Sequence, residues 1–513
     1  PHSTGGHPLS STIRHEGLVN QGKVSSLKVS VVGSHEQLLS ASKCIASHLG
    51  ISTFPWTGPD PDHLLLLDDA SLPEGPESAC TRILLLEDGV RVTEGDDLIG
   101  GRPSKMQLPG LAMIGASLAF QEVLRRNGCI RRIDIVKSHI SVHYRIDPSS
   151  SGNTADITGQ FMIRGPDGSP LPLFSRECPD NSGHISLIAR MESNEQADSL
   201  LEKTHLVDVA DHRGDADNGP STIEIRIPRQ TGGVRGGCVI AGAGGLGSWA
   251  LHSLSEGLSF SGHDGSGIEL TIIDPDIRVE DHNLNRQVLY SEDDIGSPKA
   301  TAASAVMEGR LPLADVLSGV QKIGMAELEM LDGGPNEDGE ENDADEIDLG
   351  ISLQGLPSTV LYEVLSRANV IASCVDNLRC RTVISAISNR LGIPMVNAGA
   401  GGWSGQMDVF IPDESCMVCR YGPNVAKDTN VHSCQEDGDI PFSSIVTSTA
   451  LFGSLQGLAL LAALSTDSDL IMEWPRGLVW GGRWNTVSYG SNTMPFPTEE
   501  RSHHSHLLSA LRS

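Results

Sequence analysis

Positive charge is scarce in this 513-residue chain: 37 Lys and Arg residues stand against 66 Asp and Glu residues, for a formal net charge of -29. This balance argues against non-specific binding to nucleic acid or to an anionic membrane, because both are themselves negatively charged. Much of the charge is local. Segment 337–348 carries eight acidic residues in twelve, so we expect the acidic loop 333–348 to be a solvated, disordered insertion.

The sequence also lacks an apolar run suited to crossing a membrane. Its most apolar segment, 448–464, is shorter than the roughly 20 residues that a bilayer requires, and it contains Ser, Gly and Gln. The first residues are polar and do not resemble a secretory signal. The ten cysteines show no disulfide-framework spacing, which favours a reducing compartment. We therefore expect a cytoplasmic protein with no nucleic-acid or membrane partner.

The second half, 222–513, alternates short apolar strands with helices. Strands are predicted at 237–240, 268–273, 370–374, 395–398 and 407–411. Helices are predicted at 246–258, 301–311 and 445–464, and a further helix follows the strand 370–374 and runs through Ile387. Such alternation is typical of an α/β fold with a doubly wound, mostly parallel, Rossmann-like sheet and helices on both faces.

The first half, 1–129, repeats this plan weakly. Its helix pattern at 108–124 resembles that at 446–461, so we predict a degenerate copy of the second half. This copy has no glycine-rich turn and should not bind nucleotide. Residues 130–207 alternate apolar and polar positions and predict a small β-rich docking module. The polar segment 208–221 predicts a linker.

A glycine-rich turn, GAGGLGS, follows the strand 237–240. It contains Gly242, Gly244, Gly245 and Gly247. A strand that ends in such glycines can turn sharply and approach a phosphate, and the next helix presents free N–H groups to the anion. The turn alone fits a mononucleotide site, a dinucleotide site or a purely structural turn.

Polar residues in the next segments favour a triphosphate. Asp274 and Asp276 directly follow the strand 268–273, where a carboxylate meets the ribose of an adenine nucleotide. A carboxylate at this position fits an NAD enzyme equally well. Two amides and two cations follow, at Asn283, Gln287, Arg286 and Lys299. Such cations neutralise charge at an α-phosphate under attack, which hydride transfer does not require.

Asp376 follows the buried strand 370–374. A carboxylate at the carboxyl end of a strand in an α/β sheet points into the ligand crevice, and beside a triphosphate it suits a magnesium ligand. It would also serve as a helix N-cap. We expect Asn377 and Arg381 to line the same crevice.

The chain resembles the adenylation domain of the ubiquitin-activating superfamily (ThiF/MoeB/MccB-like) over roughly 222–490. The resemblance rests on five motifs in fixed order: GAGGLGS, DPD, NLNRQ, SPK and VDN. The resemblance implies an ATP- and Mg²⁺-dependent enzyme that adenylates a carboxylate. It implies that Asp274 binds ribose, that Arg286 and Lys299 stabilise the α-phosphate, and that Asp376 holds magnesium.

The resemblance also implies two adenylation folds face to face, supplied by a homodimer or by an active and an inactive half. An arginine near one N-terminus then reaches the other half's ATP, and Arg14 in IRHEGLVNQG is our candidate. A disordered tail residue is the alternative for Arg14.

Family members carry two CxxC pairs that bind zinc. Cys416 and Cys419 form the first, but no cysteine follows Cys434. His503 and His506 have the same spacing and lie where the second pair is expected, so they are candidates to complete a Cys2His2 zinc site; the alternative is a polar tail without zinc. The position of Cys434 resembles that of a relay cysteine, which would attack the acyl adenylate, or it is an unreactive loop residue.

The leading hypothesis is an adenylyltransferase that activates the C-terminus of a peptide or small carrier protein, or a precursor-peptide side chain, for peptide modification or natural-product biosynthesis. Activation of a sulfur-carrier protein for sulfur transfer is the alternative within the same chemistry. A non-catalytic pseudo-enzyme scaffold and an NAD-dependent oxidoreductase are the alternatives outside it.

Overall fold

The computed structural model describes most of the chain and three sheets within it. The described residues are 19–56, 61–73, 79–86, 88–94, 109–129, 138–145, 173–177, 184–191, 208–211, 222–228, 232–333, 355–421, 425–427, 445–467, 470–481, 486–490 and 503–512.

The largest sheet has eight strands in the order β13-β12-β11-β14-β15-β16-β17-β18. Their bounds are β11 Gly236–Ala241, β12 Ile268–Ile273, β13 Asp315–Gly319, β14 Ala368–Ser373, β15 Met395–Gly401, β16 Ser404–Phe410, β17 Gly477–Gly481 and β18 Thr486–Gly490. The first five strands of the spatial order pair in parallel and the last three add antiparallel. The prediction of a doubly wound, mostly parallel α/β sheet is confirmed.

Helices connect these strands and cover the sheet. They are α6 Gly245–Phe260, α7 Lys299–Arg310, α8 Met325–Gly333, α9 Ser358–Arg367, α10 Leu378–Leu391, α11 Met417–Tyr421, α12 Val446–Ala463 and α13 His503–Arg512, with short 3-10 turns η4 Asp281–Asn283, η5 Glu292–Asp294, η6 Val425–Lys427 and η7 Leu470–Glu473. The central strands β11 and β14 are buried along almost their whole length because helices lie against both faces, as their continuous apolar sequences require.

The first half forms a six-stranded sheet in the order β10-β5-β4-β3-β1-β2. Its elements are α1 Gln21–Ser26, β1 Lys28–Val32, α2 Glu36–Leu49, β2 Ser52–Pro55, β3 His63–Leu67, β4 Ala79–Leu86, β5 Gly89–Glu94, α3 Pro109–Arg126 and β10 Thr222–Arg226. Strand β10 pairs with β5, so the chain from 222 begins in the first sheet. We had placed this segment at the start of the second half; its pairing partner lies about 130 residues earlier in the chain, and local pattern carries no sign of it.

The two sheets share one plan. In each, a central strand (β1 or β11) has parallel neighbours on both sides, followed outward by a further parallel strand and then two antiparallel strands. Each central strand leads into a helix, α2 or α6. The shared order is what a duplication would produce; the descent of the first half as a degenerate copy stays a prediction.

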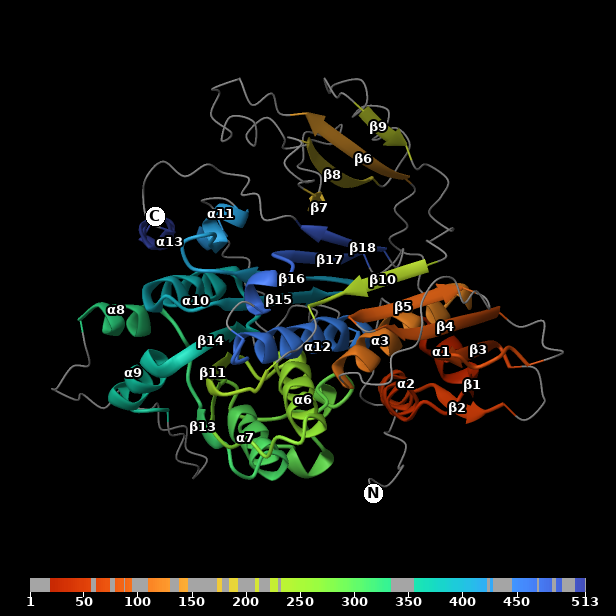
Figure 1. The fold of residues 1–513 in the computed structure, drawn as a ribbon, viewed down its shortest axis with the longest axis horizontal. Helices are drawn as coiled ribbons and strands as arrows, with labels where there is room; N and C mark the ends of the chain where they lie inside the picture. The colour runs from red at the N-terminus through yellow and green to blue at the C-terminus, as the bar shows by residue number, and fades with distance from the viewer. Residues whose placement is uncertain are drawn as a thin grey trace.

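Helix α12 joins the two halves at the centre of the molecule (Figure 1). It packs on α6 of its own half and on α3 of the other. One continuous apolar core runs from the first half through these helices into the second. By length and composition α12 would pass for a membrane-crossing helix, but 94% of its 18-residue window is buried inside the protein, as expected of a core helix.

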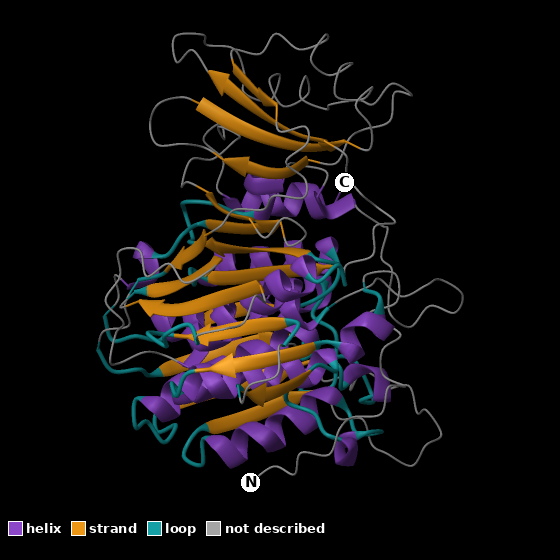
Figure 2. Ribbon diagram, turned by 90° about the vertical axis from the view of Figure 1, so that its right-hand side faces the viewer, coloured by secondary structure: helices purple, strands orange, loops and turns teal. Residues whose placement is uncertain are grey.

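A third sheet stands beyond the antiparallel edge of the second half (Figure 2). It has four antiparallel strands in the order β7-β8-β6-β9, with bounds β6 Ser138–Arg145, β7 Leu173–Glu177, β8 His184–Met191 and β9 Asp208–Asp211. The β-strands predicted for this region are present. Strand β9 lies in the segment that we had assigned to the linker.

Candidate functional site

The glycine-rich turn lies at the carboxyl end of β11, where the strand feeds directly into α6. Gly242 has a φ of 97°, and a Cβ there would approach the Cys374 carbonyl oxygen to 2.8 Å. A Cβ on Gly247 would overlap the Gly242 oxygen. These two positions therefore require glycine, because the turn folds back on itself and against the loop after β14.

The mouth of this turn is open. A Cβ at Gly244, the N-cap of α6, would meet no atom within 4 Å, and no side chain caps the helix. The first N–H groups of a 16-residue helix thus face free space at its positive end. An uncapped helix N-terminus behind a glycine turn is suited to an anion such as a phosphate.

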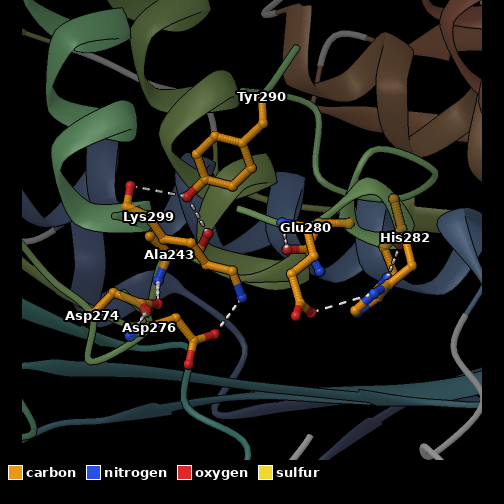
Figure 3. Close-up of polar contacts among 9 residues, drawn as sticks. Ala243, Asp274, Asp276, Glu280, His282, Tyr290 and Lys299 are labelled. Carbon is orange, nitrogen blue, oxygen red and sulfur yellow. Dashed lines mark hydrogen bonds and ion pairs between the residues drawn. The ribbon is translucent and has the colours of Figure 1, made fainter. Parts of the chain in front are cut away.

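Asp274 lies directly behind the turn, at the end of β12. Its carboxylate accepts hydrogen bonds from the backbone N–H of Ala243 at 2.5 Å and from that of Asp276 at 2.8 Å (Figure 3). Burial raises the pKa of Asp274 to about 6, opposed by nearby Lys299 and reinforced by Asp276. The residue therefore shapes the turn and is an anion near neutral pH.

Lys299 is held beside this pair of carboxylates. Its ammonium forms an ion pair with Asp276, and its backbone N–H donates to the Asp276 carbonyl at 3.0 Å. The side chain is almost buried, at 9% exposure. Lys299 is also the first residue of α7, so the turn, Asp274, Asp276 and the lysine form one contiguous set.

Tyr290, which the sequence analysis missed, joins the same elements. Its buried hydroxyl lies 2.7 Å from the carbonyl oxygen of Ala243 and 3.2 Å from that of Lys299 (Figure 3). Burial, reinforced by the carboxylates of Asp274 and Asp276, holds the pKa of Tyr290 well above its usual value, so the phenol keeps its proton and donates. Its partners lie 47 and 9 residues away, and the sequence gives no sign of either.

Arg286 lies close to the first residue of α6. A Cβ on Gly245 would lie 4.0 Å from its Nε. The residue is fixed through its backbone and its side chain: Trp249 Nε1 donates to the Arg286 carbonyl at 2.8 Å, and Arg286 Nη1 donates to the His282 carbonyl at 2.8 Å. A guanidinium and an ammonium thus both lie near the open turn.

The two predicted amides are buried in the same segment. Asn283 accepts from the Glu280 backbone N–H at 3.0 Å and so stabilises the 3-10 turn before Arg286. Gln287 is 1% exposed, and its Oε1 has no hydrogen-bond partner among the described residues. A buried amide oxygen of this kind remains available to a ligand donor.

The Asp376 loop, 374–377, follows β14 and lies against the glycine turn. The Cys374 N–H donates to Ala241 at 2.8 Å, and Gly242 faces the Cys374 carbonyl. Asp376 is exposed, with one oxygen 3.4 Å from Asn377 Nδ2. The N-cap of α10 is Asn377, which accepts from Cys380 N–H at 2.7 Å; Asp376 is thereby left free of the capping role.

Arg381 corrects one expectation. It does not line the crevice, because its guanidinium is buried beneath the Asp376 loop. There it donates to the Val375 carbonyl and the Asn397 side chain at 2.5 and 2.7 Å.

The structure brings Cys416, Cys419, His503 and His506 together, with their ligand atoms all within 4.8 Å of one another. The thiols lie 3.4 Å apart, and His503 Nδ1 lies 3.2 Å from Cys419 Sγ. His503 turns its other nitrogen to the Asp413 carbonyl at 3.3 Å, the outer contact that orients a ligating imidazole.

One sulfur of this cluster is held as the thiolate that a metal requires. The Cys416 thiol, helped by His503 and His506, holds the pKa of Cys419 well below its usual range, and the Cys419 thiolate in turn raises the pKa of His503. Two sulfurs and two imidazoles at this spacing match a tetrahedral Zn²⁺ site. Arg14 and Cys434, our remaining candidates, lie outside the described residues.

The second half of the chain is similar to known proteins of one family. Residues 234–476 match the ThiF family. The chain is 28% identical over 200 residues to the SAMP-activating enzyme E1 of Haloferax volcanii, covering 39% of this chain and 58% of that protein. It is 26% identical over 229 residues to the sulfur carrier protein ThiS adenylyltransferase of Escherichia coli, covering 44% and 71%.

A solved structure of Escherichia coli MccB with ATP superposes with a TM-score of 0.35 at 16% identity, over 51% of this chain and 65% of that one. The chain spans just over half the length of the first curated relative. The match of residues 234–476 to the ThiF family confirms the resemblance that the motif order predicted.

Proposed function

We propose that the ThiF-family domain is an ATP-dependent adenylyltransferase that activates a carboxylate. One observation carries the proposal: the open glycine turn, Asp274, Asp276 and Lys299 form a contiguous bonded set, and the Arg286 side chain lies close to Gly245 of the turn. A phosphate site flanked by two cations suits nucleotidyl transfer rather than hydride transfer.

Different residues of the chain bind the phosphates and stabilise the charge of the reacting group. The N–H groups at the start of α6 bind phosphate oxygens. Arg286 and Lys299 stabilise the charge that grows at the α-phosphate as a carboxylate oxygen attacks and pyrophosphate leaves. Lys299 is paired with Asp276 before nucleotide binds. When the phosphate arrives, the ammonium exchanges the carboxylate for the phosphate as its anionic partner, and it is already positioned beside the turn.

Asp376 and the Cys/His cluster are the proposed metal positions. The exposed Asp376 carboxylate, beside the turn, would hold Mg²⁺. When bound, magnesium neutralises part of the triphosphate charge. Cys416, Cys419, His503 and His506 would hold a structural zinc that fastens α13 to α11.

The substrate class that we favour is the C-terminus of a small carrier protein. The support is the pair of curated relatives, whose names specify a SAMP and the sulfur carrier ThiS. A precursor peptide is the second candidate. The four-stranded antiparallel sheet supports it, because β9 pairs only with β6 among the described strands and an extended peptide binds such an edge by strand addition.

The first half would serve as the non-catalytic partner of the active half within one chain. Its six-stranded sheet shares the central strand arrangement of the eight-stranded sheet, and its sequence lacks the glycine-rich turn. A cytoplasmic location belongs to this proposal as well. Cys434 as a relay cysteine and Arg14 as an arginine acting on the ATP stay predictions.

Calorimetric titration with ATP·Mg and, separately, with NAD(P)H tests the function. We expect ATP·Mg to bind and the affinity to fall at least tenfold in Lys299→Ala and in Asp376→Ala. Lys43→Ala, which removes an exposed lysine from α2, is the matched control and should bind as the wild type does. Binding of NAD(P)H without ATP would overturn the proposal.

Pyrophosphate release then separates the substrates. The purified protein with ATP·Mg is mixed with a small carrier protein ending in Gly-Gly or with a short peptide bearing a free carboxylate. Release with the carrier protein alone supports the favoured substrate, and release with the peptide alone supports the second candidate.

A further inference from the structure

A buried polar network connects the Cys/His cluster to the Asp376 loop. Its members are Arg381, Asn397, Asp408 and Tyr421, which we call the Asp408 network. They come from four different elements, α10, β15, β16 and α11, and all four side chains are buried or nearly so. The nucleotide chemistry proposed above uses none of them directly.

At one end, the network holds the backbone of the Asp376 loop. Arg381 donates to the carbonyl of Val375, the residue immediately before Asp376, at 2.5 Å. The same guanidinium donates to Asn397 Oδ1 at 2.7 Å and to the Ala398 carbonyl. The peptide that precedes the proposed magnesium ligand is therefore tied to the middle of β15.

In the middle, Asn397 and Asp408 face each other across the β15–β16 ladder. They are register partners, and Asn397 Nδ2 donates to Asp408 Oδ2 at 3.3 Å. Both residues are 1% exposed. Arg381, which is bonded to Asn397 on β15, is thereby linked to Asp408 on β16.

At the other end, α11 anchors the Asp408 carboxylate. Tyr421 donates its hydroxyl to Asp408 Oδ2, and Arg420 Nε lies 3.1 Å from Oδ1. Gln406 Nε2 donates to the Tyr421 oxygen at 2.7 Å. Arg420 and Tyr421 follow Cys419 directly in the short helix α11, and Cys416 immediately precedes that helix.

The charges make Asp408 the centre of the network. It is the one carboxylate among the four members, and it balances Arg420 by direct contact and Arg381 through Asn397. A buried guanidinium without a nearby anion is costly. Removing the Asp408 charge would therefore weaken both ends of the network at once, and networks of this kind act as units.

We propose that Asp408 is a positioning residue: anchored on α11 through Arg420 and Tyr421, it acts through Asn397 and Arg381 to hold the Asp376 loop in place for its divalent metal. The inference rests on the proposed function, because it assigns a task to a loop whose own role is proposed. Asp408 touches neither nucleotide nor metal; its effect passes through the backbone next to Asp376.

The test measures divalent-metal affinity, with Mn²⁺ as a spectroscopic probe in the presence of ATP. Asp408→Asn keeps the shape and removes the charge, and Tyr421→Phe removes one hydroxyl. We expect the Kd for Mn²⁺ to rise about tenfold or more in Asp408→Asn and several-fold in Tyr421→Phe, since outer-shell changes typically cost 10–100-fold. Saturating Mn²⁺ should restore ATP binding, and zinc content should equal that of the wild type.

Glu122→Gln is the matched control. Glu122 is a buried carboxylate in α3 that pairs with Arg125 and Arg126, so the substitution removes a comparable buried charge elsewhere. It should lower the melting temperature and leave the Kd for Mn²⁺ unchanged.

Three results separate the claims. A wild-type Kd in Asp408→Asn, or in a folded Tyr421→Phe if the first variant does not fold, overturns the inference and leaves the proposed function standing. An equal loss of affinity in Glu122→Gln also overturns it, because general destabilisation then explains the effect. Absence of ATP binding by the wild type overturns the proposed function and the inference with it.

Discussion

Lys299 shows how a single side chain is prepared for its proposed task. It lies 9% exposed against Asp276, so most of the desolvation of its ammonium has occurred before any ligand binds. Asp276 balances its charge meanwhile. Replacing that carboxylate by a phosphate requires a movement of the side-chain tip only, because α7 already fixes the backbone.

Asp274 should give stability a distinctive pH dependence. Burial raises its pKa from 3.8 to about 6, so between pH 4 and pH 6 the unfolded chain loses this proton before the folded chain does. The contribution to stability is therefore greatest below pH 4 and falls as the pH rises to about 6, by up to about 3 kcal/mol.

Chemical denaturation at several pH values checks this. The difference in unfolding free energy between the wild type and Asp274→Asn should decrease from pH 4 to pH 6 and then level off. The exposed Asp293→Asn should track the wild type throughout. Parallel profiles for the wild type and Asp274→Asn would contradict the prediction.

Residue-scale prediction succeeded where the residue type itself carries the chemistry. His503 and His506 were chosen because their spacing repeats that of Cys416 and Cys419, and the structure places all four together. Tyr290 and Trp249 were missed because each acts through a backbone carbonyl far away in the chain. Any buried aromatic with a polar tip fits such a role equally well on sequence alone.

At the scale of elements, α6 and α12 are in unusually close contact. A Cβ on Gly453 would lie 2.4 Å from that of Trp249, and one on Gly457 would lie 2.6 Å from the Ala250 carbonyl oxygen. Two helix backbones approach this closely only where one side lacks side chains. The contact sets the position of α6, and α6 presents the open N-terminus to the phosphate site.

Gly453→Ala should therefore separate the two helices. We expect it to destabilise the protein by about 1–3 kcal/mol and to weaken ATP binding, because the start of α6 moves. Gly309→Ala on α7 is the control: nothing lies within 4 Å of its Cβ position, so it should stabilise the protein by up to about 1 kcal/mol through helix propensity. Thermal unfolding and calorimetry measure both effects; equal behaviour of the two variants would refute the account.

The pairing of α11 with α13 leads to a prediction for metal removal. Purified protein should contain about one zinc per chain, and a chelator should lower its melting temperature, because α13 would lose its link to α11. Cys419→Ser and His506→Ala should lose the zinc, whereas His504→Ala, a neighbouring histidine outside the cluster, should retain it. Elemental analysis measures the zinc content of each variant. Zinc at wild-type level in His506→Ala would exclude His506 as a ligand.

At the scale of the whole molecule, the two large sheets share one apolar core. It includes Val29 and Ile45 of the first half, Leu458 at the centre, and Ile240 and Leu270 of the second half. A buried hydrogen bond of 2.9 Å from Thr447 to Gln121 also crosses between the halves. The burial of α3 and α12 therefore depends on both halves.

The two halves should consequently unfold together. Hydrogen exchange measured at increasing urea concentration should give the same midpoint for strands β1, β3 and β4 as for β11, β12 and β14. Leu458→Ala, which opens a cavity in α12 where it faces Gly110 of α3, should lower both midpoints equally. Two separated midpoints would show that the halves are independent domains.

The sequence by itself determined the local elements and the residue types of the proposed nucleotide site. Strand β12 and helix α12 were predicted within one residue, because period and composition act over short distances. The motif order likewise predicted the ThiF-family resemblance, since glycines, carboxylates and cations are recognisable by residue type.

Tertiary structure decided what depends on partners remote in the chain. It placed β10 in the first sheet through its pairing with β5, moved Arg381 from the crevice to a position beneath the Asp376 loop, and joined α11 to the Asp376 loop through the Asp408 network. Pairing energy and buried-charge compensation arise only when such segments meet. No local sequence pattern predicts these contacts between remote segments, so they are seen only in the folded chain.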